Sequence, residues 1–111
     1  MAGTFYHERL AEYGIEVLTP SESEQDTIHD IVYRELVQNR LCDESRRIFI
    51  KIIHGLAQQG AQGCILGCTE IPLLTKASDV EIPVFDTTRI HCEVAVARAF
   101  DTVSATLVPP P

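Results

Sequence analysis

The chain has 111 residues, with 9 Lys and Arg against 16 Asp and Glu, which gives a formal net charge of −7. This length predicts one domain, and the acidic balance argues against nucleic acid or an anionic membrane as a partner. The longest uncharged run, between Lys51 and Glu70, is too rich in glutamine and glycine to span a bilayer. No apolar signal segment follows Met1, so the expected location is the cytoplasm.

The first predicted elements are a helix and a strand. Residues 5–13 place apolar side chains at helical spacing, and Gly14 is a typical stop residue. Residues 15–18 alternate in polarity and include two β-branched residues, which predicts a short strand that Pro20 closes. The chain therefore opens on a helix and not on a strand.

Two helices are predicted next. Ser21 or Ser23 can cap the first, which carries acidic residues in its first turn and frays near Asn39. Its apolar stripe consists of Ile28, Ile31, Val32 and Leu36. The second helix covers about residues 43–59 and stops at Gly60. Its broad apolar face contains Ile48, Phe49, Ile52, Ile53, Leu56 and Ala57.

Strands and helices alternate in the rest of the chain. The apolar run 63–67, bounded by glycines, is typical of a strand buried on both faces of a parallel sheet. Residues 71–74 begin a short helix with Pro72 in its first turn, and residues 82–85 predict another strand. A final helix over about residues 89–105 is capped by the preceding polar residues, with Ile90, Val94, Ala97 and Phe100 facing inward.

The order of elements is helix, strand, helix, helix, strand, helix, strand, helix. Such alternation predicts an α/β layered domain with a parallel sheet. Residues 1–107 form this single domain in our interpretation, and the proline-rich residues 108–111 form a disordered tail.

The cysteines and histidines show no redox or metal-ligand spacing, so no metal site is expected. All cysteines are expected to be reduced, and Cys42, Cys64 and Cys92 are interpreted as small buried apolar residues. The histidines at positions 7, 29 and 54 are interpreted as surface residues. His91, on the last helix, is interpreted as exposed or hydrogen-bonded and not as a catalyst.

Polar residues follow the ends of two predicted strands, where ligands bind in open α/β sheets. One set is Cys68, Thr69 and Glu70, and the other is Asp86 with Thr87. The first set combines a thiol, a hydroxyl and a carboxylate with backbone N–H groups at a helix start. Such a group can hold a carboxylate-bearing ligand, and the helix start would lower the pKa of the thiol. From spacing alone, a plain turn in the first set and a helix cap in the second are the alternative interpretations.

Residues 66–74, Leu-Gly-Cys-Thr-Glu-Ile-Pro-Leu-Leu, resemble the second catalytic motif of the aspartate/glutamate racemase family. Residues 56–63 match the helix and turn that precede this motif, and residues 83–91 resemble the family's later signature. Segments between residues 5 and 20 also fit the family's pattern. The resemblance therefore covers nearly the whole chain, and it is strongest to the broad-specificity amino-acid racemases.

The resemblance implies a three-layer parallel-sheet domain, like the second of two similar domains in these enzymes. It also implies racemisation of an amino acid without a cofactor, with one cysteine from each domain acting on one face of Cα. Cys68 matches the second of these cysteines and is the expected catalytic residue. Thr69 and Glu70 are expected to bind substrate, Thr69 at a carboxylate and Glu70 at the ammonium group or beside the thiol.

Parts of the family pattern are missing from this sequence. It lacks the Asn-Thr motif with the other catalytic cysteine, and it lacks the first strand of the second domain. We therefore expect a C-terminal portion that is inactive alone, because no acid serves the second face of Cα. A missing central strand would leave backbone groups and apolar faces uncovered, which favours a homodimer or association with a complementary racemase half.

Two other hypotheses stay open. The chain can be a non-catalytic module that binds a dicarboxylic amino acid or pairs with a full-length racemase, and it can be a fragment without a role of its own. The sequence does not identify the amino-acid substrate, because specificity in a cleft between two domains depends on residues from both.

Overall fold

The computed structural model describes residues 5–105, with the side chains of residues 7–100. The helices and strands are α1 (Phe5–Ala11), α2 (Glu22–Arg34), α3 (Asp43–Gln58), β1 (Cys64–Leu66), α4 (Ile71–Leu74), β2 (Val84–Asp86) and α5 (Thr87–Ala105). Two single-turn 3-10 helices, η1 (Leu36–Gln38) and η2 (Ala77–Asp79), lie between them. The tail predicted at residues 108–111 lies outside the described residues.

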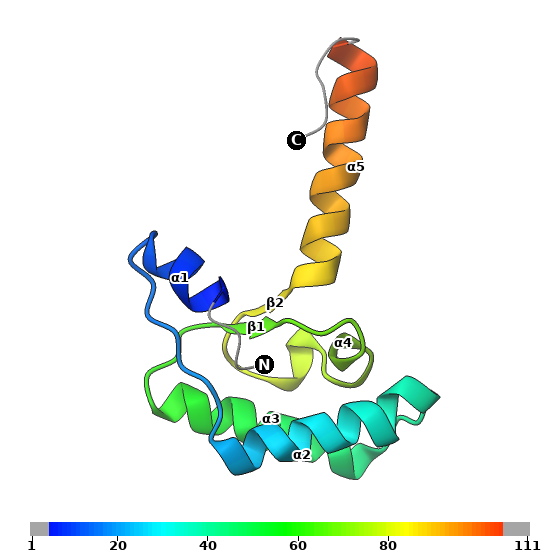
Figure 1. The fold of residues 1–111 in the computed structure, drawn as a ribbon. Coiled ribbons are helices and arrows are strands. Elements are labelled where there is room, and N and C mark those ends of the chain that lie inside the picture. Colours follow the sequence, from blue (N-terminus) through cyan, green and yellow to red (C-terminus); the bar gives the residue numbers. More distant parts are fainter. Residues whose placement is uncertain (1–4, 106–111) are drawn as a thin grey trace.

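The strands form a parallel pair, which confirms the predicted α/β class. Cys64 pairs with Val84 and Leu66 with Asp86, so the carboxyl ends of β1 and β2 lie side by side. Helices α2 and α3 run next to each other on one side of this pair, whereas α5 rises away on the other (Figure 1). No helix among residues 5–105 has both the length and the apolarity to cross a membrane.

Two local signals predicted in the sequence mark helix ends, although α1 ends at Ala11, α2 ends at Arg34 and α5 begins at Thr87, a few residues from the predicted bounds. Ser21 caps α2 in a capping box: the backbone N–H of Glu24 donates to Ser21 Oγ at 3.3 Å, and that of Ser21 donates to Glu24 Oε1 at 2.9 Å. Gly14 has φ +73° and closes α1, because glycine adopts this left-handed conformation without a steric penalty. Gly60, which follows α3, also has a positive φ, +109°.

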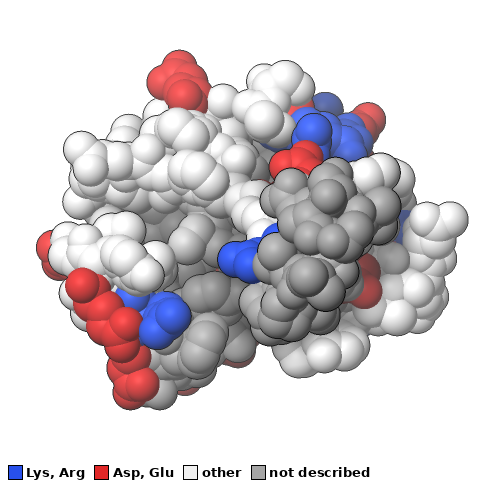
Figure 2. All heavy atoms as spheres, turned by 90° about the horizontal axis from the view of Figure 1, so that it is seen from above, with Lys and Arg blue, Asp and Glu red and all other residues white. Residues whose placement is uncertain are grey.

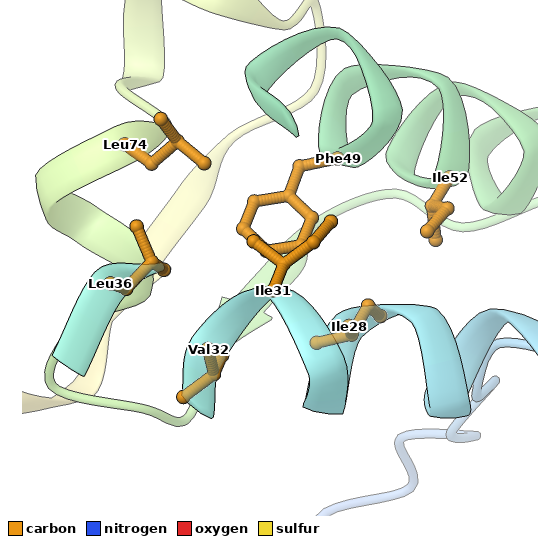
Figure 3. Close-up of a cluster of buried hydrophobic side chains, with 7 residues drawn as sticks. All are labelled: Ile28, Ile31, Val32, Leu36, Phe49, Ile52 and Leu74. Atoms are coloured by element: carbon orange, nitrogen blue, oxygen red, sulfur yellow. The ribbon is translucent and has the colours of Figure 1, made fainter. Parts of the chain in front are cut away.

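The core lies where α2, η1, α3 and α4 meet (Figure 3). It consists of Ile28, Ile31, Val32, Leu36, Phe49, Ile52 and Leu74, all less than 9% exposed. Partly buried apolar residues, among them Ile48, Leu56 and Cys68, pack against it. The predicted stripe of α2 and the predicted face of α3 therefore meet as expected, and α4 closes the end of the cluster with Leu74.

The predicted strand at residues 15–18 does not form. This segment has no regular secondary structure, and both Ile15 and Leu18 are exposed. A strand needs the backbone of a neighbour to complete its hydrogen bonds. Within the described part of the chain, β1 and β2 pair only with each other, so this segment has no strand to join.

Two burial predictions on the α5 side are also wrong. Ile65 in β1 is exposed and so is its neighbour Phe85, whereas the sequence predicted a strand covered on both faces. The residues of α5 expected to face inward, Ile90, Val94, Ala97 and Phe100, are all exposed. The Cα radius of gyration is 16.4 Å, compared with about 13 Å for a compact domain of this length. Among the described residues, no other element covers these side chains of α5, and the helix stands apart from the core.

Candidate functional site

The two polar sets predicted from the sequence come to one edge of the sheet. Because β1 and β2 are parallel and Leu66 pairs with Asp86, the residues that follow each strand emerge side by side. After β1 the chain continues through Cys68, Thr69 and Glu70 into α4. After β2 it enters α5 without any intervening loop.

Hydrogen bonds fix the start of α5 to the end of β1. The Thr87 hydroxyl donates to the backbone carbonyl of Leu66 at 3.1 Å, two residues before Cys68. Asp86 Oδ1 accepts from the backbone N–H of Arg89 at 3.1 Å, which confirms its predicted role as a helix cap. The first turn of α5 and the segment that carries Cys68 are therefore held together.

The centre of the site is a contact between a thiol and a carboxylate. Cys68 Sγ donates to Glu70 Oε2 at 3.0 Å, and the Cys68 side chain is partly buried against the core. Burial raises the pKa of the Cys68 thiol, and the hydrogen bond to Glu70 raises it further. The predicted lowering of this pKa is therefore wrong. Backbone hydrogen bonds from Glu70 and Ile71 do act in the predicted direction, but burial and the carboxylate outweigh them.

Glu70 is the acceptor that joins all three predicted site residues. Hydrogen bonds from the Cys68 thiol and then from the Thr69 hydroxyl lower the pKa of its carboxyl group. At neutral pH the group consequently contains an ionised Glu70 and a protonated Cys68. In this state the Cys68 thiol can donate a proton. It can act as a base only when its hydrogen bond to the Glu70 carboxylate weakens.

The other cysteines differ from the prediction. Cys42 and Cys92 are exposed and Cys64 is half-buried, so only Cys64 approaches the buried state expected for all three. The cysteines among residues 5–105 are free thiols. The histidines at positions 7, 29 and 54 are exposed, as expected, and so is His91. No group of three or more His, Cys, Asp or Glu in the described residues is arranged to hold a metal ion.

The structure reveals a second thiol and carboxylate in contact, which the sequence did not predict. Ser45 Oγ donates to Glu35 Oε1 at 2.6 Å, and this bond, followed by one from Cys42, lowers the pKa of Glu35. The hydrogen bond with Glu35 in turn raises the pKa of Cys42. The two residues are brought together by the turn at η1, and no periodic pattern of residues marks such a turn.

Around Cys68, Gly67 and Thr69 are exposed and Glu70 is partly exposed. A hollow of about 420 Å³ occurs elsewhere, between α3 and the segment 79–82. Its lining includes Ile53, His54 and Glu81 but none of the predicted site residues.

Comparisons with known proteins agree with the resemblance. Residues 2–95 match the family described as Asp/Glu/Hydantoin racemase. A candidate Asp/Glu racemase from Yersinia pestis has a similar structure, with 42% sequence identity and a TM-score of 0.81 over 88% of this chain. An aspartate racemase homologue from Pyrococcus horikoshii OT3 gives 34% identity and a TM-score of 0.77 over 86%. The match covers 43% of the first of those chains and 42% of the second, so this chain spans less than half of their length.

Proposed function

Since the chain belongs to the Asp/Glu/Hydantoin racemase family, we propose that it supplies one half of the active site of a cofactor-independent amino-acid racemase, with Cys68 as the catalytic residue. The substrate is an amino acid of the aspartate or glutamate type. The observation that carries this proposal is the 3.0 Å contact between Cys68 Sγ and Glu70 Oε2 at the carboxyl end of β1. Open α/β sheets bind their ligands at that edge.

The proposed chemistry is a proton transfer between sulfur and Cα. When Cys68 acts as acid, its S–H bond breaks, the electron pair stays on sulfur, and the proton forms a C–H bond with the carbanion at Cα. When Cys68 acts as base, the thiolate takes the proton from Cα and leaves the pair on carbon. Each transfer serves one face of Cα, so inversion needs a second acid or base on the opposite face.

Through Glu70, the pKa of Cys68 would depend on whether substrate is bound. Without substrate, its carboxylate accepts the hydrogen bond of the thiol and keeps the proton on sulfur. The ammonium group of an amino acid would pair with Glu70 and offset its charge, which lowers the pKa of Cys68 and frees the thiolate. Thr69, whose hydroxyl is next to Glu70, is proposed to bind the substrate's carboxylate.

The second face requires a partner. We propose that the chain associates either with a second copy or with a complementary racemase half, and that it does not invert the centre alone. The match to less than half of each solved relative supports this proposal. A thiol that must cycle between acid and base also needs a reducing compartment, so we place the protein in the cytoplasm.

Deuterium exchange at Cα tests the role of Cys68. The chain is incubated in D2O with each enantiomer of aspartate and glutamate, alone and with a complementary half, and incorporation is followed by mass spectrometry. We expect exchange that Cys68→Ser abolishes and that Cys42→Ser, the substitution of an exposed thiol, leaves unchanged. An absence of exchange in every mixture would contradict the proposal.

The role of Glu70 is tested by alkylation of Cys68. Glu70→Gln removes the negative acceptor, so the pKa of Cys68 should fall and labelling by iodoacetamide near neutral pH should become faster. Peptide mapping separates Cys68 from the other thiols, and Glu44→Gln, an exposed acid on α3, is the control. Labelling of Cys68 that stays the same or slows in Glu70→Gln would show that the carboxylate does not hold the thiol.

The alternative is a module that binds a dicarboxylic amino acid, or pairs with a racemase, without catalysis. Its support is that the chain spans less than half of its solved relatives. Titration calorimetry with both enantiomers separates the two candidates: binding without deuterium exchange favours the module, and exchange that depends on Cys68 rejects it.

A further inference from the structure

The segment that runs from the end of β1 through α4 is held at both of its ends by side chains from distant elements. Thr87, at the start of α5, donates to the backbone carbonyl of Leu66 at 3.1 Å. At the other end, Arg46 of α3 donates from Nε to the backbone carbonyl of Leu74 at 2.8 Å. Cys68 lies between these two attachments, so its position depends on both of them.

Helix α4 depends on its neighbours because it is a single turn of four residues, too short to be stable by itself. The Leu74 side chain is fully buried in the core (Figure 3), which fixes the end of the helix on its apolar side. The hydrogen bond from Arg46 fixes the same residue through its backbone. With its side chain and its carbonyl both held, Leu74 determines where the preceding residues of α4 lie.

Two cationic side chains serve the carbonyl groups at the end of α4, which have no partner within the helix. Lys76 Nζ donates to the carbonyl of Pro72 at 2.6 Å, and Arg46 supplies the donor for Leu74. Lys76 is close to α4 in sequence and moves with it, whereas Arg46 belongs to α3. Of these two cations, only Arg46 therefore ties the helix to another element of the fold.

The guanidinium group of Arg46 is itself held in place. Its Nη1 donates to the carboxylate of Asp43, one turn earlier on α3. The side chain of Arg46 is 34% exposed and that of Asp43 is 77% exposed, so the arginine is the more enclosed member of the pair. Because the guanidinium group is rigid and planar, it can donate to the carboxylate and to the Leu74 carbonyl at once in a fixed geometry.

The other end of α4 lies against the sulfur of Cys68. Burial and the Glu70 carboxylate raise the pKa of this thiol, whereas hydrogen bonds from the backbone N–H groups of Glu70 and Ile71 act in the opposite direction. The carboxylate is on a flexible side chain and can follow the thiol. The two N–H groups belong to the backbone at the start of α4, so they stay beside the sulfur only while the helix keeps its place.

We propose that Arg46 is a positioning residue for Cys68: its hydrogen bond to Leu74 fixes α4, and α4 in turn holds two backbone donors beside the sulfur. Both donors stabilise the thiolate, which is the form in which Cys68 would take the proton from Cα. The inference rests on the proposed function for the task of Cys68, but the effect of Arg46 on the thiol can be measured without any catalysis. Arg46 acts through α4 and is not itself a catalytic residue.

The rate of alkylation of Cys68 as a function of pH tests this role. Iodoacetamide reacts with the thiolate, so the midpoint of the rate profile reports the pKa of the thiol, and peptide mapping separates Cys68 from the other thiols. Arg46→Met keeps most of the apolar length of the side chain without its donors. It should move the midpoint to higher pH by about half a pH unit or more, and slow labelling near neutral pH by about threefold or more, because the thiolate loses the backbone donors. A midpoint that is unchanged, or that moves to lower pH, would overturn the inference.

Arg47→Met is the matched control for the loss of a positive charge. Arg47 is the next residue of α3 and is exposed, whereas Arg46 is partly buried. In the view from above, basic side chains are dispersed and some have acidic neighbours (Figure 2), so the loss of one exposed cation should change the charge around the site little. The midpoint should therefore stay in place in Arg47→Met. An equal shift in both variants would assign the effect to charge alone and overturn the inference.

Two further variants separate positioning from a general loss of stability. Arg46→Lys keeps the charge and one donor for the Leu74 carbonyl, so it should return the midpoint toward that of the unmodified chain. Ser21→Ala weakens α2 at the end away from η1 and α4 and should not move the midpoint. If Lys fails to restore the midpoint, or if Ser21→Ala moves it as far as Arg46→Met does, Arg46 has no specific role toward Cys68.

Circular dichroism shows whether each variant is folded. If Arg46→Met is not, Asp43→Asn provides the measurement, because it releases the guanidinium group without removing it. The midpoint should then move in the same direction by a smaller amount, and no movement would overturn the inference. Deuterium exchange at Cα separates the two proposals. A shifted midpoint without exchange in any mixture would refute the catalysis and leave Arg46 in its role, whereas exchange that depends on Cys68, with an unmoved midpoint in Arg46→Met, would do the reverse.

Discussion

The two sides of this molecule are similarly apolar in sequence and opposite in burial. Around α2, α3 and α4, the side chains of Phe49 and Leu74 are 3% and 0% exposed. On α5, Phe100 is 68% exposed. The first set of side chains packs against other elements of the chain, whereas the side chain of Phe100 is left exposed by the described residues. The comparison teaches that an apolar pattern predicts which residues favour burial. Whether they are buried depends on the elements that pack against them.

The same contrast applies to the backbone. Helix α2 closes its own hydrogen bonds and is capped by Ser21, so it needs only one apolar neighbour to be stable. Strands β1 and β2 have three residues each and one partner each among the described residues. A pair of such short strands is marginal by itself. Local unfolding should therefore require less free energy at β1 and β2 than at α2.

Truncation of a phenylalanine on each side is the strongest test of this contrast. Phe49→Ala should lower the free energy of unfolding by about 3–5 kcal/mol, because it removes a buried ring and leaves a cavity. Phe100→Ala should change it by less than about 0.5 kcal/mol, because the ring is already in water. Urea unfolding followed by circular dichroism measures both, and similar losses would mean that α5 is packed in solution.

Removal of the cap of α2 should have a smaller effect. Ser21→Ala deletes the side-chain acceptor of the capping box, and we expect a loss of about 1 kcal/mol. Ser23→Ala removes a hydroxyl that lies 3.3 Å from Ser21 Oγ but is not part of the capping box, so it should cost less. If both variants unfold at the same urea concentration as the unmodified chain, the cap does not contribute to the stability of this side.

The connection between the two sides is tested at Thr87. Thr87→Val removes the hydrogen bond to the Leu66 carbonyl, with an expected loss of about 1 kcal/mol or less. The clearer readout is local: amides near Cys68 should exchange with D2O faster, while those of α2 should not change. Thr88→Val, at an exposed neighbouring position, should leave both unchanged. Unaltered exchange near Cys68 in Thr87→Val would show that the start of α5 does not hold this segment.

The smallest expected effect is a dependence of stability on pH. Hydrogen bonds from Ser45 and Cys42 lower the pKa of Glu35 in the folded state. The resulting stabilisation is present above the unfolded pKa of about 4.5 and is lost as the pH falls through the folded value. The free energy of unfolding should thus decrease in acid, and Glu35→Gln and Ser45→Ala should each reduce that decrease. Urea titrations at neutral and acid pH measure the slope, and equal slopes in all three proteins would contradict the expectation.

The sequence predicted what short-range interactions control. Ser21, Gly14 and Asp86 act within one turn of a helix end, so their roles could be predicted without knowledge of the fold. The order of elements likewise predicted the parallel sheet, and the resemblance predicted the family. The resemblance also implied Cys68, Thr69 and Glu70 as site residues; their role stays a prediction, and the structure joins them by hydrogen bonds.

The tertiary structure alone decided the rest, because those properties depend on neighbours that are distant in sequence or outside this chain. Residues 15–18 have the pattern of a strand, but no strand within residues 5–105 pairs with them. The thiol of Cys68 is at a helix start, but burial and the carboxylate of Glu70 set the direction of its pKa shift. Phe100 has the pattern of a buried residue, but no layer of the described residues covers it. A helix forms its backbone hydrogen bonds within itself. A strand, an apolar face and a buried charge each need a partner from elsewhere.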